Sequence, residues 1–304
     1  MRKPLVVMCL ASLMIALTAL PGNCQTSQAE TEAEAETPHT PPPILVLARE
    51  EVKPGKAAAH EKLETAWSQA YAKADWPVYT LALEALTGVP EIWFCSGYPN
   101  YEAMQVENES FRAHPALVAE TDRYATQEEE FLNSMHRWIL SYRDDLSYQP
   151  NVNIGGFHDW MVDVIHVRIG HGPEFAHTRQ LINGAHQRAN MDEHIIVYQI
   201  VSGGPMETFV VFQPIPSIKF VDTMAATHGN GSDYSNELGE EGRGQAADFM
   251  INDVENFERY LFATSPSMSY MPKDVVAADP GFWSPKPMNP AKPSEAKITK
   301  PKAQ

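Results

Sequence analysis

Short segments of this chain alternate between apolar and polar positions, and longer ones repeat apolar positions at helical spacing. Residues 44–48 form an apolar run that predicts a strand, and residues 54–55 (Pro-Gly) predict the turn that ends it. Residues 56–74 predict a helix with one buried face, because apolar side chains recur there at intervals of three and four. These side chains are Leu63, Trp67, Ala70, Tyr71 and Ala74.

Two further strands are expected directly after this helix. They span residues 78–86 and 92–96, and residues 87–90 between them (Thr-Gly-Val-Pro) are typical of a hairpin turn. A long helical stretch is then predicted over residues 111–142, followed by a short fourth strand at residues 146–148. The expected order of elements is therefore β-α-β-β-α-β.

The same order is expected a second time further along the chain. The predicted elements are a strand at 162–169, a helix at 174–190, strands at 195–201 and 209–213, a helix at 244–263 and a short strand at 268–270. Short sequence matches support the repetition at a shift of about 116–122 residues, namely 44–52 with 162–169, 88–94 with 204–210, and 146–150 with 268–272. Because this period is the size of a domain, we expect two similar units, residues 44–150 and 158–272.

The predicted fold class is α+β, built from two tandem ferredoxin-like units of βαββα[β] order. In such a unit the helices cover one face of an antiparallel sheet, and the other face needs a partner. A second unit in the same chain can supply that partner.

Two motifs resemble the dimeric α+β barrel superfamily, which includes the antibiotic-biosynthesis-monooxygenase-like and NIPSNAP-like families. One is the strand end at residues 52–56 (VKPGK), and the other is the hairpin leading into residues 91–93 (EIW). The likeness covers residues 44–104 and 161–224, whereas the long segment 111–142 departs from the smallest members. The resemblance implies an intramolecular pseudo-dimeric α+β barrel around a cavity, which members of the superfamily use for cofactor-free oxygenation, haem breakdown or binding.

The first strand of each unit has one face that turns polar at the same end. Arg49 and Glu51 end this face in the first unit, and His166 and Arg168 end it in the second. We expect this face to line the shared cavity, where the four side chains could hold an anionic or carbonyl-bearing ligand and His166 could move a proton. The alternative interpretations are an ion-pair cluster that only joins the two units, or a polar strand end that lies in solvent.

Other strands add further candidates. A buried Glu84 would need a cation, and Arg49 is a suitable one. Trp93 and Phe209 occupy matching positions at the start of the third strands and are interpreted as core residues. The candidate ligand-binding residues are Arg49, Glu51, Glu84, His166, Arg168 and Tyr198, with His166 as the candidate acid or base.

The histidine pattern predicts no metal site. Helix phase places His60 and His186 on buried faces but His177 on an opposite face, and no HExxH motif occurs. No cofactor is expected; haem is the alternative, for which His166 or His194 would have to ligate the iron. Cys95 is interpreted as a buried thiol.

Both ends of the chain differ from the part between them. Residues 1–24 predict a secretory signal peptide, with an uncleaved membrane anchor or lipidation at Cys24 as alternatives. Residues 25–43 are an acidic, Pro-rich segment and residues 273–304 a Pro/Lys-rich one, and both compositions favour disorder. The protein is therefore expected to be secreted or periplasmic.

Composition narrows the classes of partner. The 304 residues carry a net charge of −16, which becomes about −18 if Arg2 and Lys3 are removed with the signal peptide. Such a surface repels nucleic acid and anionic lipid. We expect a monomer or homodimer that binds a small molecule, with no nucleic-acid partner and no membrane span after cleavage of the signal.

The sequence thus favours an exported small-ligand-binding protein whose cavity lies between two ferredoxin-like sheets. A monooxygenase-like enzyme without cofactor, or a haem-related one, is the catalytic version of this hypothesis. The alternative is a non-catalytic envelope protein that binds a partner through its acidic surface. The sequence does not distinguish an enzyme from a binding protein.

Overall fold

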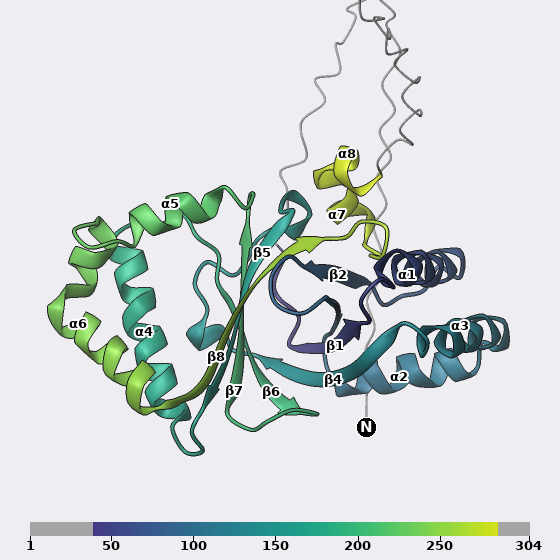
Figure 1. Cartoon of the computed structure of the whole chain (residues 1–304), viewed down its shortest axis with the longest axis horizontal. Coiled ribbons are helices and arrows are strands. Elements are labelled where there is room, and N and C mark those ends of the chain that lie inside the picture. Colours follow the sequence, from purple (N-terminus) through teal and green to yellow (C-terminus); the bar gives the residue numbers. More distant parts are fainter. Residues whose placement is uncertain (1–38, 285–304) are drawn as a thin grey trace, which may run out of the picture. The chain divides into compact units, whose positions relative to one another are not determined.

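A computed structural model of the chain describes residues 39–284 (Figure 1). The predicted signal peptide, most of the acidic segment and the last twenty residues lie outside this range. Within it, no helix is both long and apolar enough to cross a membrane.

Two successive parts of the chain contain the same order of strands and helices. The first comprises β1 (Ile44–Val52), α1 (Ala57–Lys73), β2 (Thr80–Ala85), β3 (Glu91–Tyr98), α2 (Tyr101–Arg112), α3 (Pro115–Glu128) and β4 (Leu132–Tyr142). The second comprises β5 (Asp159–Val167), α4 (Gly172–Arg188), β6 (Ile196–Ser202), β7 (Thr208–Ile215), α5 (Phe220–Thr227), α6 (Asp233–Asn252) and β8 (Val254–Thr264). The remaining elements are the 3₁₀ turns η1 (Asp144–Leu146) and η2 (Ile154–Gly156) and the short helices α7 (Lys273–Ala278) and α8 (Pro280–Trp283).

The eight strands form one closed antiparallel barrel in the order β1-β3-β2-β8-β5-β7-β6-β4, with β4 pairing back onto β1. The predicted α+β class is therefore confirmed. Two pairings join the first four strands to the last four: β2 with β8, where Leu83 lies opposite Thr264, and β4 with β6, where Leu140 lies opposite Ile200. Every strand has a neighbour on both sides, so the sheet has no free edge.

Alternation along each strand separates the barrel interior from the face under the helices. Leu47 on β1 and Val162 on β5 are fully buried in the largest apolar cluster, which fills the middle of the barrel. Val167, one residue after His166, belongs instead to the cluster beneath α4, where the rings of Phe175 and Phe209 stack at 3.9 Å. The predicted division of the first strands into an interior and a helix-facing side is thus correct. Helices α1–α3 and α4–α6 lie on different sides of the barrel (Figure 1).

The fourth strand of each of the two parts was expected in the wrong place. Residues 132–142 and 254–264, predicted as helix ends, are β4 and β8, and the preceding helices stop at Glu128 and Asn252. Residues 146–148 and 268–270 contribute only isolated bridges, such as the one between Thr80 and Tyr270. The two strands are hard to see because most of their side chains are exposed or half-buried, which weakens the alternation.

Two segments expected to be disordered include residues that pack on the barrel. Residues 39–42 lie across one end of the barrel, and the chain after residue 273 continues as α7 and α8. Val275 and Trp283 of these helices belong to the barrel's apolar cluster, and Trp283 Nε1 donates to the Gly155 carbonyl at 2.9 Å. A few apolar residues in a proline-rich segment therefore suffice to order it where they meet a buried surface.

Candidate functional site

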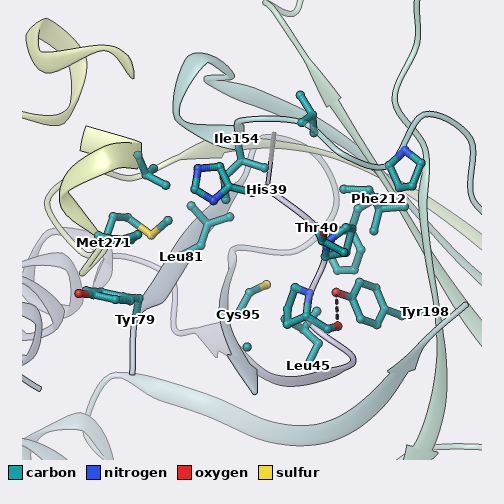
Figure 2. A pocket seen from close by; sticks show the side chains of 18 of the residues that line it. His39, Thr40, Leu45, Tyr79, Leu81, Cys95, Ile154, Tyr198, Phe212 and Met271 are labelled. Carbon is teal, nitrogen blue, oxygen red and sulfur yellow. Dashed lines mark hydrogen bonds between the residues drawn. The ribbon is translucent and has the colours of Figure 1, made fainter. Parts of the chain in front are cut away.

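A cavity of about 320 Å³ occupies the end of the barrel at which β1 and β5 begin (Figure 2). It lies beyond the filled middle of the barrel, on the side where residues 39–42 and the segment before α7 close over the strand ends. Its walls are mostly apolar. Among the residues that line it are Leu45, Leu81, Cys95, Tyr198, Phe212 and Met271.

The segment 39–42 is held against the cavity by a specific contact. Tyr198, which is buried, donates its hydroxyl hydrogen to the Pro42 carbonyl at 3.0 Å (Figure 2). Gly97 on β3 permits the close approach of this segment, because a Cβ atom there would lie only 2.6 Å from Pro42 Cγ. The start of the described chain therefore forms one wall of the cavity.

The titratable groups in the depth of the cavity are held neutral. Burial raises the pKa of the Cys95 thiol to about 12 and raises the pKa of Tyr198 well above its ordinary value. His39 lies at the rim, with its Nε2 3.5 Å from Asp274 Oδ2. This environment suits an uncharged, mainly apolar ligand.

Arg49 lies four residues along β1 from the cavity wall, in an ion pair inside the barrel. Its Nη2 is 2.9 Å from Glu91 Oε2, and both side chains are nearly buried, at 13 % and 10 % exposed. Trp93 Nε1 donates to the same Glu91 oxygen at 2.6 Å. The guanidinium carbon also lies 4.6 Å and 4.8 Å from the ring centroids of Trp93 and Trp138. The guanidinium of Arg49 is therefore already bound by other side chains of the protein.

His166 lies towards the same end of the barrel as Arg49 but has other partners. Its Nδ1 lies 2.8 Å from the Thr208 hydroxyl, and its Nε2 lies 3.1 Å from Glu255. The expected hollow between Arg49 and His166 is replaced in the middle of the barrel by packed aromatic rings, with Trp93 and Phe262 at a centroid distance of 4.7 Å. Large side chains from several strands fill the space that the sequence pattern assigned to a ligand.

The remaining predicted residues are spread over the molecule. Glu51 accepts hydrogen bonds from Asn133 and Ser134 on the neighbouring strand, and Arg168 is exposed after the end of β5. Glu84 is also exposed, and the expected Glu84–Arg49 pair is wrong because Arg49 pairs with Glu91. Of the six candidate residues, Tyr198 lines the cavity.

The matched positions Trp93 and Phe209 are both core residues, as predicted, but they face opposite sides of the sheet. Trp93 points into the barrel, whereas Phe209 packs under α4. The strand register explains this: Arg49 pairs with Trp93, but its counterpart His166 pairs with Thr208, one residue before Phe209. A shift of one residue reverses the face.

A second group of titratable residues lies buried beneath α1 and α3. His60 Nε2 is 2.9 Å from Glu50, and Glu64 and Glu128 complete the group. Burial, followed by the carboxylates of Glu50 and Glu128, raises the pKa of Glu64 to about 10. Burial is also the largest cause that raises the pKa of Glu50 and of Glu128 to about 7. Protons therefore neutralise much of this carboxyl cluster at neutral pH.

Part of the cavity wall that sequence reasoning missed comes from the two segments assigned to disorder. Residues 39–42 belong to the acidic, Pro-rich segment and Val275 to the Pro/Lys-rich one, whereas Met271 and Pro272 end the second predicted unit. The signal in the C-terminal segment is a short apolar stretch, residues 275–278 (Val-Val-Ala-Ala), between charged residues. Such a stretch is too short to predict docking onto the end of a barrel.

Known proteins resemble this chain in fold alone. No family model and no curated protein matches its sequence. An anthrone oxidase-like protein of known structure covers 76 % of this chain and 94 % of its own, at 10 % identity and a TM-score of 0.50. A provisionally assigned monooxygenase from Fusobacterium nucleatum covers 74 % and 94 % (11 % identity, TM-score 0.48). Chlorite dismutase from Candidatus Nitrospira defluvii, solved with imidazole, covers 77 % and 94 % (8 % identity, TM-score 0.44). The likeness to the anthrone oxidase-like protein is one of fold, and it agrees with the barrel fold that the sequence resemblance predicted.

Proposed function

We propose that this protein is an exported binding protein for a small, apolar molecule, which it holds in the cavity at the end of the barrel. The observation that carries the proposal is the apolar cavity of about 320 Å³ with the Tyr198 hydroxyl in its wall. That volume is at the lower end of the range of small-molecule pockets, roughly 300–1,000 Å³. Export follows from the predicted signal peptide.

Binding explains the cavity better than catalysis does. Cofactor-free oxygenation needs a base near the substrate, but the titratable groups in the depth of the cavity, Cys95 and Tyr198, hold their protons too tightly to serve. His39 lies only at the rim, where its imidazole faces Asp274. Haem does not fit either. Of its two candidate ligands, His166 is bonded to Thr208 and Glu255, and His194 Nδ1 lies 2.7 Å from the Gln149 carbonyl. Neither His166 nor His194 is among the described residues that line the cavity.

We infer further that the barrel is an intramolecular pseudo-dimer of two tandem ferredoxin-like units. The repeated order of elements supports this inference, as do the two equivalent joins between the fourth strand of one part and the second strand of the other. In this proposal the ligand contacts residues of the cavity wall. It does not contact five of the residues predicted to bind it, namely Arg49, Glu51, Glu84, His166 and Arg168.

Filling the cavity is expected to abolish ligand binding while the fold survives. Ile154 is half-buried in η2 at the cavity wall, so Ile154→Trp places an indole in or across the cavity. The full chain, secreted and purified, is examined by native mass spectrometry for a co-purified small molecule and titrated with an apolar fluorescent dye. We expect the bound molecule to disappear and the dye affinity to fall at least tenfold.

The matched control is Leu86→Trp, which adds the same indole at a position that is 45 % exposed and outside the cavity wall. It is expected to leave binding unchanged. Wild-type protein that carries no small molecule and binds no dye would contradict the proposal. That result would favour the alternative of an envelope protein that acts through its acidic surface.

A further inference from the structure

A second cavity, of about 390 Å³, lies outside the barrel between the sheet and helices α4, α5 and α6; we call it the helix-side cavity. Figure 1 shows these three helices together on one side of the strands. Its walls include Met161 and Val211 of the sheet, Arg179 of α4 and Met224 of α5. It is separate in position from the barrel cavity, since the sheet lies between them. Three potential metal ligands also line it: His186, Glu193 and His228.

The three ligand atoms converge although they come from three different segments. His186 is in the last turn of α4, Glu193 precedes β6, and His228 follows α5. The two Nε2 atoms are 3.3 Å apart, and His228 Nε2 is 3.5 Å from Glu193 Oε1. His186 Nε2 lies 4.0 Å from Glu193 Oε2. Ligands about 2.0–2.2 Å from one ion are separated by about 3–3.5 Å, so a small contraction would bring all three onto an ion.

Neighbouring groups orient two of the ligands in the manner typical of metal sites. His228 Nδ1 donates to the Met224 carbonyl at 3.1 Å, which leaves the lone pair on Nε2, the atom that faces His186. Gln213 Nε2 donates to Glu193 Oε2 at 3.0 Å and so fixes the carboxylate. Outer contacts of this kind set the tautomer of a ligating imidazole and raise its basicity.

His186 is almost completely buried in the wall of the helix-side cavity. The side chain is 4 % exposed, and its Nδ1 has no hydrogen-bond partner among the described residues. The ring of Tyr234 stacks on it at 4.8 Å and restricts its rotation. His228, 26 % exposed, gives an ion a route from solvent.

The helix-side cavity also contains a guanidinium with unused hydrogen-bonding capacity. Arg179 Nη2 donates to Asn183, but its Nε is buried without a partner in the described part of the chain. The other guanidinium in the wall, that of Arg259, is already paired with Asp163 through Nε at 2.7 Å. Arg179 is therefore the group of this cavity that is free to pair with an anion.

We propose that His186, Glu193 and His228 bind one divalent first-row transition-metal ion, and that Arg179 holds a small anionic ligand on its open side. Two imidazoles and one carboxylate form a three-ligand set that leaves coordination positions open. The ion replaces the contact between the two imidazoles by three metal–ligand bonds and compensates the charge of the buried carboxylate. The anion, by its chemistry a carboxylate or similar group, completes the coordination shell beside the guanidinium.

The carboxyl cluster beneath α1 and α3 is the competing place for a cation. It comprises Glu50, His60, Glu64 and Glu128, and it is lined by buried side chains throughout. Protons already neutralise much of it, and the raised pKa values of its three carboxyl groups indicate that it releases these protons reluctantly. The experiment therefore includes a variant in each cluster.

The test uses the full chain, treated with a chelator and titrated with Co²⁺, whose visible absorption reports its ligands. We expect one Co²⁺ per chain, with affinity reduced at least 100-fold in His228→Ala and Glu193→Gln. His177→Ala, an exposed histidine of the same helix α4, and Glu64→Gln are expected to bind as the wild type does. Circular dichroism of each variant verifies folding, and His228→Ala is the mildest change because that side chain is partly exposed.

Failure of the wild type to bind Co²⁺ would overturn the proposal, as would binding that survives in His228→Ala and Glu193→Gln but is lost in Glu64→Gln. The anion site is tested with azide, which should shift the Co²⁺ absorption of the wild type. In Arg179→Gln we expect Co²⁺ binding to persist and azide affinity to fall at least tenfold. An azide response that is absent from the wild type, or unchanged in Arg179→Gln, would refute the role of Arg179.

Discussion

Replacing Arg49 by methionine is expected to lower the free energy of unfolding by about 3–5 kcal/mol, the usual cost of removing one member of a buried ion pair. The substitution leaves the Glu91 carboxylate, 10 % exposed, without its cation and removes the guanidinium from between two tryptophan rings. Chemical denaturation of the purified protein at pH 7 measures the loss. Binding of the apolar dye should not change at temperatures at which the variant is folded.

The control for this prediction is Arg168→Met. In the sequence repeat, Arg168 occupies the position that matches Glu51. Its side chain is exposed, so its loss should change the free energy of unfolding by less than about 0.5 kcal/mol. The double variant Arg49→Met with Glu91→Gln should recover part of the loss, since no buried charge then remains unpaired. A single variant Arg49→Met as stable as Arg168→Met would show that the ion pair contributes nothing.

Glu64→Gln is expected to raise stability at alkaline pH. The pKa of Glu64 is raised from its ordinary 4.5 to about 10 in the folded protein, so folding takes up a proton between these values. Stability from this group is fully present below about pH 4.5 and is lost as the pH rises towards 10, at about 1.4 kcal/mol per pH unit. Glutamine needs no proton, so the variant should lose about 4 kcal/mol less than the wild type between pH 5 and pH 8.

Urea denaturation at pH 5, 6.5 and 8 measures this difference, with Glu61→Gln, an exposed carboxyl on the same helix α1, as the control. Glu50 and Glu128 have pKa values of about 7, and their titration adds to the fall between pH 5 and 7 in every variant. Parallel pH profiles for Glu64→Gln and the wild type would mean that Glu64 is ionised in the folded protein.

Sequence patterns predicted most of the elements because each carries its own periodicity. The strand faces that end in Arg49 and His166 were assigned correctly, since alternation depends only on neighbouring residues. β4 and β8 were missed because they directly follow helices without a Gly or Pro signal, and few of their side chains are buried. Their recognition depends on pairing partners that are distant in the sequence.

The cavities could not be predicted in the same way. Whether Arg49 faces a hollow or a packed interior depends on the volumes of Trp93, Phe262 and other side chains from several strands. The His186, Glu193 and His228 group likewise combines a helix, a loop before a strand and a turn between helices. Helix phase placed His186 on the buried side, but nothing local to His228 indicates that the two imidazoles meet.

Because the barrel closes within a single chain, each side chain occurs in it once. In an assembly of two identical subunits, any substitution occurs at both symmetry-related positions. In this chain a substitution changes only one of the two corresponding positions in the barrel. The outer face of the sheet thus carries a carboxyl cluster under α1 and α3 and an imidazole pair under α4 to α6. Closure within one chain also makes formation of the barrel a unimolecular event, so the midpoint of unfolding should not vary with protein concentration.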